Sequence, residues 1–385
     1  MKLLLYDFNS FTQKDIMSAL DQIGIKYENV LYKLSDVQSD HYFEKRMKEI
    51  LKESDFDAVF SVNFFPVLAR ICNDLQVKYI AWSYDSPLRE ADLAETIGLP
   101  MNYVFLFDGE ECKKWNRKGF RNIFHMPLAV NVERMDAVPI TETDKQKYSY
   151  DVSMVGQLYE SVLPDLLQLC NAYDRGYISA LIETQLKLYG CYLFDEVVPQ
   201  GLAERMCEEY HRITGNVLDM DTETLRFHMA KEVTNLERCF LLEEMAITSK
   251  LRLYSPNKGN LSDNIYWTGT AGYFDEMPKI FKLSKINLNI TLKCIQSGIP
   301  LRALDILGAG GFLLTNYQSE LAEYFVDGED LVMYYSLEDA MEKYEYYMNY
   351  EEERVQIAHN GHKKVKELFR YDTKLKEIFA ISGLL

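Results

Sequence analysis

The sequence predicts an α/β fold of two doubly wound domains, each a parallel sheet covered by helices on both faces. Short apolar runs of strand length alternate with helical patterns along most of the chain, and this alternation is typical of buried parallel sheets. A polar stretch without hydrophobic period, residues 139–149, divides the alternation into two series. The length of 385 residues also suits two domains.

The first series predicts an N-terminal Rossmann-like domain over residues 1–138. Its first apolar run ends in the turn Phe8-Asn9-Ser10, and a helical pattern begins near Thr12. More apolar runs follow, separated by helical stretches. We expect strands at residues 2–7, 57–62, 77–84, 103–107 and 122–126, and helices at residues 12–23, 42–52, 65–75 and 109–117.

The second series predicts a C-terminal Rossmann-like domain over residues 150–370, followed by a tail helix within residues 371–385. A strand at 150–156 is followed by a long helical pattern, residues 161–247, which we interpret as a helical insertion. Strands are then expected at residues 250–254, 264–267, 285–290, 311–315 and 330–334. Two such domains are expected to face each other across a cleft, where the carboxyl ends of parallel strands bind ligands.

Composition excludes several function classes. The chain has 42 Lys and Arg against 59 Asp and Glu, a net charge of −17, which disfavours nucleic acids and anionic lipid surfaces as partners. No apolar run is long enough to span a membrane, and the start, which reaches an acid at Asp7, is not typical of a signal peptide. The seven scattered cysteines fit reduced thiols. We therefore expect a cytoplasmic protein.

Residues 286–315 carry the clearest chemical pattern. A strand ends in a polar loop, and Ser297-Gly298-Ile299-Pro300 opens a helix, since proline suits a first helical turn. The free amides and positive pole of such a helix end can hold a diphosphate. Arg302 can add charge-assisted contacts, and Asp305, on the same helix face, can accept both hydroxyls of a ribose. The alternative is a structural helix in which Arg302 and Asp305 pair with each other.

Polar residues at strand ends provide further candidates. Asn287 and Asn289 alternate on one strand and so share a face, which indicates either ligand contact or turn capping. Asp85 follows the strand at 77–84, and could be a general base for an acceptor hydroxyl or a helix cap. His125 likewise ends a strand, where it could contact a sugar or transfer a proton, or be a buried structural histidine.

Metal chemistry is not indicated. The chain has no C-x-x-C motif, and its Asp219-Met-Asp221 lies in the helical insertion, where a loop or cap is the preferred interpretation. We expect metal-independent chemistry in which a helix end and Arg302 meet the phosphate charge.

Three C-terminal stretches and four N-terminal stretches resemble a known family, and the resemblance extends over nearly the whole chain. Leu-Arg-Ala-Leu-Asp-Ile-Leu-Gly-Ala-Gly-Gly-Phe-Leu-Leu-Thr is similar to the C-terminal domain of CgeB-like glycosyltransferases, which are GT-B proteins first named from a spore-maturation protein. The N-terminal half resembles the domain that accompanies it in many Firmicutes. The other matching stretches are residues 320–330, 351–361, 82–87, 105–108, 125–131 and 151–156.

This resemblance implies a GT-B fold, with a nucleotide-sugar donor held mainly by the C-terminal domain and an acceptor held mainly by the N-terminal one. Asp305 lies where related enzymes have a ribose-binding Glu, and Ser297 lies where many retaining relatives have a second Glu. Relatives also carry an Arg or Lys soon after the equivalent of Gly156, whereas Gln157-Leu-Tyr-Glu160 has neither. The positive charge is then expected from Arg302, or else from Arg238 or Lys258; for Arg238 the alternative is a surface pair with Glu237 or Glu243.

The predicted function is transfer of a sugar from a nucleoside diphosphate donor, expected to be UDP-linked, to a hydroxyl of a protein, glycan or lipid-linked saccharide, without a further cofactor. Two alternatives stay open, namely a non-catalytic sugar-nucleotide-binding module of a spore or surface assembly and a sugar-nucleotide epimerase. The predicted catalytic residues are Asp85 and His125. The predicted donor-binding residues are Gly156, Asn289, Ser297, Gly298, Ile299, Arg302 and Asp305.

Overall fold

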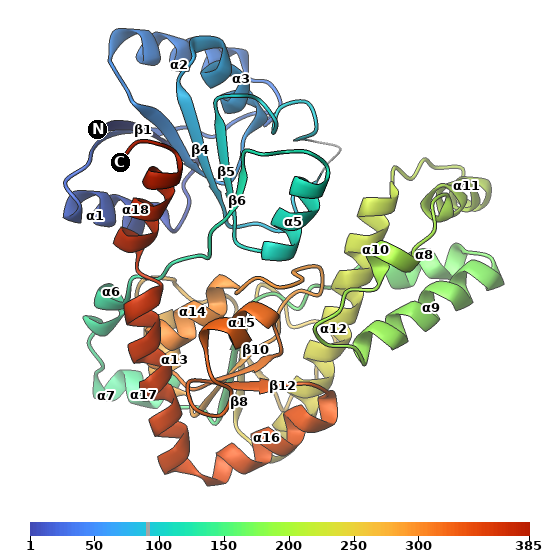
Figure 1. Cartoon of the computed structure of the whole chain (residues 1–385). Coiled ribbons are helices and arrows are strands. Elements are labelled where there is room, and N and C mark those ends of the chain that lie inside the picture. The colour runs from blue at the N-terminus through green and yellow to red at the C-terminus, as the bar shows by residue number, and fades with distance from the viewer. Residues whose placement is uncertain (90–92) are drawn as a thin grey trace. The chain divides into compact units, whose positions relative to one another are not determined.

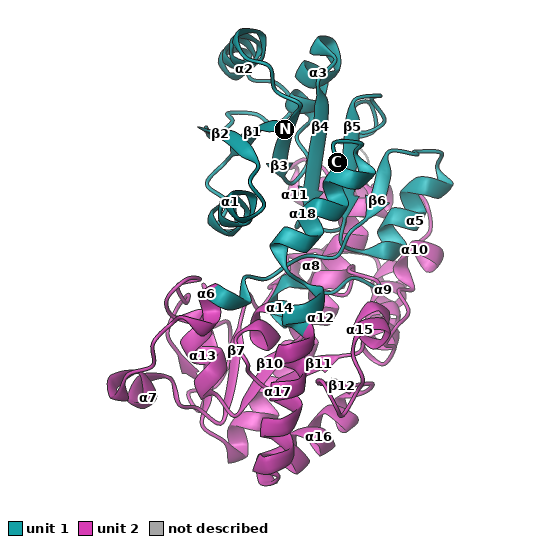
Figure 2. Cartoon of the chain, turned by 60° about the vertical axis from the view of Figure 1, so that its left-hand side comes forward, with its two compact units in different colours: residues 1–133, 297–304, 365–385 teal, residues 134–296, 305–364 magenta. Residues whose placement is uncertain are grey.

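The structure is a computed structural model that describes residues 1–89 and 93–385. It contains two six-stranded sheets in which all paired strands are parallel, which confirms the two doubly wound domains. The backbone forms two compact units, coloured separately in Figure 2. Unit 1 comprises residues 1–133, 297–304 and 365–385, and unit 2 comprises residues 134–296 and 305–364.

Unit 1 is built on a sheet with strand order β2-β1-β3-β4-β5-β6. Its chain order alternates strands with helices, as Figure 1 shows from blue to teal. The elements are β1 (Lys2–Asp7), α1 (Gln13–Gln22), β2 (Lys26–Leu31), α2 (His41–Glu53), β3 (Ala58–Val62), α3 (Pro66–Leu75), β4 (Lys78–Ser83), β5 (Asn102–Leu106), α5 (Gly109–Arg117), β6 (Ile123–His125) and α18 (Tyr371–Ile381).

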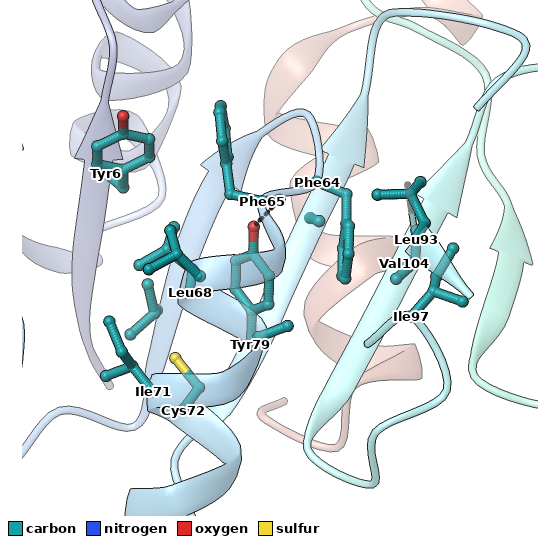
Figure 3. Packing of buried hydrophobic residues seen from close by; sticks show 14 of the residues in the cluster. Tyr6, Phe64, Phe65, Leu68, Ile71, Cys72, Tyr79, Leu93, Ile97 and Val104 are labelled. Carbon is teal, nitrogen blue, oxygen red and sulfur yellow. Dashed lines mark hydrogen bonds between the residues drawn. The ribbon is translucent and has the colours of Figure 1, made fainter. Parts of the chain in front are cut away.

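The core of unit 1 follows from side-chain alternation along its strands. Leu4 and Tyr6 of β1 join a buried cluster with residues of α2 and α3, as Figure 3 shows for part of this cluster. Tyr79 of β4 is fully buried there, and its hydroxyl accepts a hydrogen bond from the Phe65 backbone N–H at 3.0 Å. Burial raises the pKa of this phenol far above its usual range, so it stays protonated.

Strand β2 was not among the expected strands. Its sequence, Lys-Tyr-Glu-Asn-Val-Leu, is polar, and most of its residues are exposed or half-buried because it lies at the edge of the sheet. An edge strand needs little apolar surface, so hydrophobic pattern alone does not reveal it.

Unit 2 is built on a sheet with strand order β12-β11-β10-β7-β8-β9. Helices α6 (Val132–Asp136), α14 (Leu301–Gly308) and α17 (Glu351–Leu368) contain three of the four divisions between the units, and the fourth lies between residues 296 and 297. Its other elements are α7 (Glu142–Tyr148), β7 (Val152–Val155), α8 (Leu163–Leu169), α9 (Ala172–Leu186), α10 (Phe194–Val197), α11 (Leu202–Thr214), α12 (Thr222–Thr248), β8 (Leu251–Tyr254), β9 (Tyr266–Trp267), α13 (Met277–Leu283), β10 (Ile286–Asn289), β11 (Leu313–Asn316), α15 (Ser319–Tyr324), β12 (Val332–Tyr334) and α16 (Leu337–Asn349).

Helices α8 to α11 pack around the first half of α12, as the green and yellow ribbons of Figure 1 show. They have a buried cluster of their own, which includes Leu163, Ile178, Phe194 and Met229. The second half of α12 instead packs into the core of the sheet through Leu241, Leu242 and Met245. Helix α12 therefore joins the helical segment to the strands of unit 2.

The polar stretch 139–149 contains helix α7 rather than an extended linker. Thr141 and Asp144 form a capping box: the Asp144 backbone N–H donates to Thr141 Oγ1 at 3.2 Å, and the Thr141 backbone N–H donates to Asp144 Oδ2 at 2.9 Å. Local capping thus stabilises a helix that has almost no apolar face.

Among the described residues, no helix combines the length and the apolar character that a bilayer crossing requires.

Gly361 provides a test of the packing in unit 2. A β-carbon added to it would clash with the Asp330 carbonyl oxygen and lie 2.8 Å from Leu307 Cδ2. Because the backbone carbonyl cannot move away easily, we expect Gly361→Ala to lower the free energy of unfolding by about 1–3 kcal/mol. The matched control is Gly176→Ala in α9, where the added β-carbon meets nothing within 4 Å. Thermal unfolding followed by circular dichroism compares the two, and equal melting temperatures would contradict the packing described for Gly361.

Candidate functional site

The strand order of unit 2 fixes where a ligand is expected. The chain starts at β7, goes to β8 and β9 on one side, and returns to β10, β11 and β12 on the other. The order of the strands therefore reverses between β7 and β10, and open α/β sheets bind ligands at the carboxyl ends of the strands beside such a switch point.

Arg238 lies at this switch point. It comes from α12 and is 7% exposed, and its guanidinium donates hydrogen bonds to the carbonyls of Gln157, after β7, and Ile290, after β10. The guanidinium carbon also lies 4.6 Å from the centre of the Tyr159 ring. One cationic side chain thus joins the ends of the two parallel strands between which the strand order reverses.

Gly156 ends β7 beside this arginine. A β-carbon at this position would lie 3.4 Å from Arg238 Nη1, an ordinary contact distance, and the backbone φ of 155° is what favours glycine here. No Arg or Lys closely follows Gly156 in the sequence, as noted above. Helix α12 nevertheless places the positively charged Arg238 beside it.

Two glutamates considered as surface partners of Arg238 bind other groups. Glu237 is fully buried and forms an ion pair with Lys293 at 2.7 Å, while the hydroxyls of Tyr189 and Tyr334 donate to its Oε1 at 3.0 and 2.8 Å. Burial holds the pKa of both phenols far above the usual range, so both remain donors. Glu243 accepts hydrogen bonds from the backbone and side chain of Ser262, each at 2.6 Å. Arg238 is consequently a buried group of the sheet edge rather than a helix-surface residue.

Asn287 and Asn289 are both buried, and their described hydrogen bonds connect parts of the sheet. The Asn287 amide accepts from Ser153 Oγ at 2.9 Å and donates to the Phe281 carbonyl at 3.0 Å. The Asn289 amide donates to Thr315 Oγ1 at 3.0 Å. These contacts hold β10 against its neighbours.

Ser297, Gly298 and Ile299 belong to unit 1 and precede α14, whose first residue is Leu301. Asp108 Oδ1 accepts hydrogen bonds from the Ser297 hydroxyl at 2.7 Å and from its backbone N–H at 3.2 Å. A β-carbon on Gly298 would lie 2.9 Å from the Asp108 Cα and from the Phe107 carbonyl oxygen. Ile299 is 1% exposed. This segment therefore packs closely on the end of β5, and only glycine fits at position 298.

Arg302 and Asp305 lie on α14 on either side of the division between the units. Arg302 is partly exposed. Asp305 is 1% exposed, and the Tyr273 hydroxyl donates to its Oδ1 at 3.2 Å. Tyr273 lies in the loop between β9 and α13, and its ring centre is 5.0 Å from the guanidinium carbon of Arg134. Asp305 is thus buried, and its carboxylate already accepts a hydrogen bond from one hydroxyl group.

Asp85 and His125 lie in unit 1, at the carboxyl ends of β4 and β6. Asp85 is exposed, and its Oδ2 accepts a hydrogen bond at 2.6 Å from Nδ2 of Asn63, which follows β3. His125 is half-buried, with Nε2 3.3 Å from the Phe107 carbonyl oxygen. Asn63, which the sequence analysis did not single out, orients Asp85.

Glu111 is a further residue that sequence reasoning missed. It is 6% exposed, and its carboxylate accepts hydrogen bonds from Ser86 Oγ at 2.5 Å and from the Leu88 backbone N–H at 2.6 Å. Burial raises the pKa of Glu111 to about 7. The local sequence Asp108-Gly-Glu-Glu111 is typical of an ordinary capped start of a helix. It therefore does not reveal that Glu111 binds the loop that contains Ser86.

Asp221, from the Asp-Met-Asp stretch of the insertion, caps α12. Its Oδ1 accepts from the Thr224 backbone N–H at 2.7 Å, which confirms the cap interpretation for this residue.

Comparison with known proteins adds two findings. Residues 237–380 match the protein family described as glycosyl transferase-like. A search of curated proteins finds no match to the chain.

Several solved structures are similar over the whole chain. HepE of Anabaena, in complex with UDP-glucose, is 10% identical with a TM-score of 0.55 and full coverage of both chains (100%). Sucrose-phosphate synthase of Thermosynechococcus elongatus is 9% identical with a TM-score of 0.59, covering 100% of this chain and 98% of that one. WaaG, a glycosyltransferase involved in lipopolysaccharide biosynthesis, is 12% identical with a TM-score of 0.54 and 100% coverage of both chains. At such identities these likenesses show the GT-B fold.

The GT-B fold of the whole chain and the match of its C-terminal part to a glycosyl transferase-like family together support a glycosyltransferase. The fold and the enzyme class expected from the sequence are therefore confirmed.

Glu111 generates a pH-dependent prediction. Because its pKa is raised from 4.5 to about 7 in the folded chain, folding favours its protonated form. Its contribution to stability is complete below pH 4.5 and is lost as the pH rises through about 7, a change on the order of 3 kcal/mol. Glu111→Gln removes this titration.

The measurement is urea unfolding of the wild type and Glu111→Gln at several pH values between about 4 and 8. We expect the wild type to lose stability relative to the variant over that interval. A constant difference between the two proteins at all pH values would contradict the raised pKa.

Proposed function

We propose that the chain transfers a sugar from a UDP-linked donor to a hydroxyl acceptor, as a member of the CgeB-like branch suggested by its sequence. The single observation that carries this proposal is the buried Arg238 at the switch point of unit 2. HepE, which shares the fold, was solved in complex with UDP-glucose.

Arg238 is proposed to bind the donor diphosphate. A guanidinium has several N–H donors in one plane, so it can bind backbone carbonyls and phosphate oxygens together. Its carbonyl contacts fix the plane before any ligand binds, which reduces the entropy lost on binding. Little solvent reaches a side chain that is 7% exposed, so its attraction for the leaving diphosphate is only weakly screened.

Asp305 is proposed to bind the ribose hydroxyls. Its carboxylate is nearly inaccessible to water, and it already accepts a hydrogen bond from Tyr273. We propose that this phenol occupies the place of a ribose hydroxyl until the donor binds.

The other predicted donor residues keep roles that fit their contacts. In unit 2, Gly156 lies beside the Arg238 guanidinium, and Asn289 holds the end of β10. In unit 1, Ser297 anchors its segment to Asp108, the backbone amides of Gly298 and Ile299 remain candidate phosphate donors, and Arg302 supplies charge.

The N-terminal domain, residues 1–138, is proposed to hold the acceptor, and residues 150–370 the donor. Asp85, oriented by Asn63, is the proposed general base for the acceptor hydroxyl, and His125 a proposed contact to the sugar or a proton carrier. We propose that the reaction takes place in the cytoplasm. We also propose that it is metal-independent, because arginine side chains can neutralise the diphosphate. The proposed acceptor is a protein hydroxyl or a surface glycan.

The role of Asp305 is tested by calorimetric titration with a panel of nucleoside diphosphates. Removing a hydrogen bond to a charged group costs about 1.5–3 kcal/mol, so Asp305→Ala is expected to weaken UDP binding by roughly 10- to 100-fold. Tyr273→Phe is the control, since it removes only the tyrosine hydroxyl and leaves the Asp305 carboxylate to bind the ribose. A folded Asp305→Ala protein that binds every nucleoside diphosphate as the wild type does would refute this assignment.

The role of Arg238 is tested by Arg238→Lys, which keeps the charge but loses the planar fork. Arg252 is a matched position: it donates to the Lys147 carbonyl at 2.9 Å and lies 4.7 Å from the Tyr150 ring centre, but it belongs to β8, outside the switch point. The control variant is therefore Arg252→Lys. We expect both Arg238→Lys and Arg252→Lys to lower the melting temperature. Only Arg238→Lys is expected to weaken UDP binding, by about tenfold or more. Equal UDP affinities in the two variants would remove the support that Arg238 gives to the proposed function.

A further inference from the structure

A hollow in unit 2 lies along one face of α12. It has a volume of about 720 Å³ and is bounded by α12, the loop after β7 and the loop after β8. Helical positions 232, 235, 236, 239, 240 and 243 line it, at the spacing of a single helix face. We call this hollow the α12 groove. Arg238 is not among the residues lining it.

Part of the lining of the α12 groove is apolar. Leu158 and Pro164 lie on one side, and Leu236 and Phe240 of α12 lie on the other. Leu236 and Phe240 are 40% and 43% exposed, which is high for side chains of their size that face a hollow. Apolar surface of this kind, bordered by polar groups, is typical of interaction sites.

The charged side chains that line the groove are all acidic. Four carboxylates line it, those of Glu160, Glu232, Glu243 and Glu244, and no Lys, Arg or His is found among its described lining residues. Burial raises the pKa of Glu232. The groove therefore repels a diphosphate and attracts a cation, so it is distinct from the proposed donor site.

The lining of the groove suits an organic cation better than a metal ion. Across residues 1–89 and 93–385, no group of three or more His, Cys, Asp or Glu side chains is arranged to hold a metal. The apolar side chains of the lining would not contribute to binding a metal ion.

The exposed apolar surface continues beyond the groove. Ile247, 69% exposed, lies eleven positions after Leu236 on α12, and eleven helical steps at about 1.5 Å cover roughly 16 Å. Val162, 54% exposed, extends the surface on the loop side. A surface of this length matches several residues of a polypeptide better than a small molecule.

We propose that the α12 groove binds an amphipathic protein segment that carries Lys or Arg beside apolar side chains. The apolar side chains contact Leu236 and Phe240, and the cationic groups pair with Glu232 and Glu244. A second copy of the chain fits poorly, because the net charge of −17 makes two copies repel each other. This inference does not depend on the proposed transferase chemistry.

The test uses the full chain and a fluorescein-labelled, 14-residue Lys/Leu peptide of about four helical turns, with the leucines on one face. A second peptide carries Glu in place of every Lys. Fluorescence anisotropy is expected to show binding of the Lys peptide alone, weakened by salt. Absence of binding, or equal binding of the Glu peptide, would overturn the proposal.

Variants locate the binding. The double variant Glu232→Gln and Glu244→Gln is expected to weaken Lys-peptide binding by about tenfold, and Phe240→Ala by a similar factor. The matched control, Glu351→Gln with Glu352→Gln, removes the same charge from exposed positions of α17. Equal weakening by the two double variants would mean that the peptide is attracted non-specifically to an acidic protein. That result would refute binding at the α12 groove.

Cysteine footprinting gives an independent readout without any substitution. Cys239 lines the groove and is half-buried, whereas Cys191 is exposed and lies outside it. The Lys peptide is expected to slow N-ethylmaleimide labelling of Cys239 and leave Cys191 unchanged, as measured by mass spectrometry. Protection of neither or both thiols contradicts the proposal, and protection by spermine but not by the peptide would assign the groove to a small polyamine instead.

Discussion

The C-terminal unit depends on one buried cation that joins two strands. The guanidinium of Arg238 binds carbonyls after β7 and after β10, and these are the strands at which the order of the sheet reverses. A charge buried this deeply is costly unless hydrogen bonds and an electron-rich partner compensate for it. The two carbonyls and the Tyr159 ring supply that compensation. The same contacts keep the guanidinium fixed at the ligand-binding edge, so one arrangement serves both the fold and the proposed chemistry.

Next to this arginine, Glu237 and Lys293 form a second buried network. Glu237 has no exposed surface, and two tyrosine hydroxyls and an ammonium group satisfy it. Consecutive residues of α12 thus bear opposite charges, and their described side-chain contacts are with different groups.

The sequence predicted the fold well because buried strands and amphipathic helices have strong local patterns. It failed where the cause of a structure is not local. Strand β2 is polar because it lies at an edge, and helix α7 depends on a capping box rather than on an apolar face. The position of Arg238 depends on how a long helix crosses the end of the sheet, which periodicity does not encode. The burial of Glu111 depends on the loop containing Ser86, far away in sequence.

The three-segment composition of unit 1 has a consequence for synthesis of the protein. Helix α18 contributes the fully buried Phe379 to this unit, and the Ser382 carbonyl accepts a hydrogen bond from Lys78 at 2.6 Å. On the ribosome, the strands of unit 1 emerge before unit 2, whereas α18, which belongs to the same unit as these strands, emerges after it. Nascent chains must therefore keep an apolar surface unpaired while all of unit 2 is made, which makes the early polypeptide a natural client for chaperones.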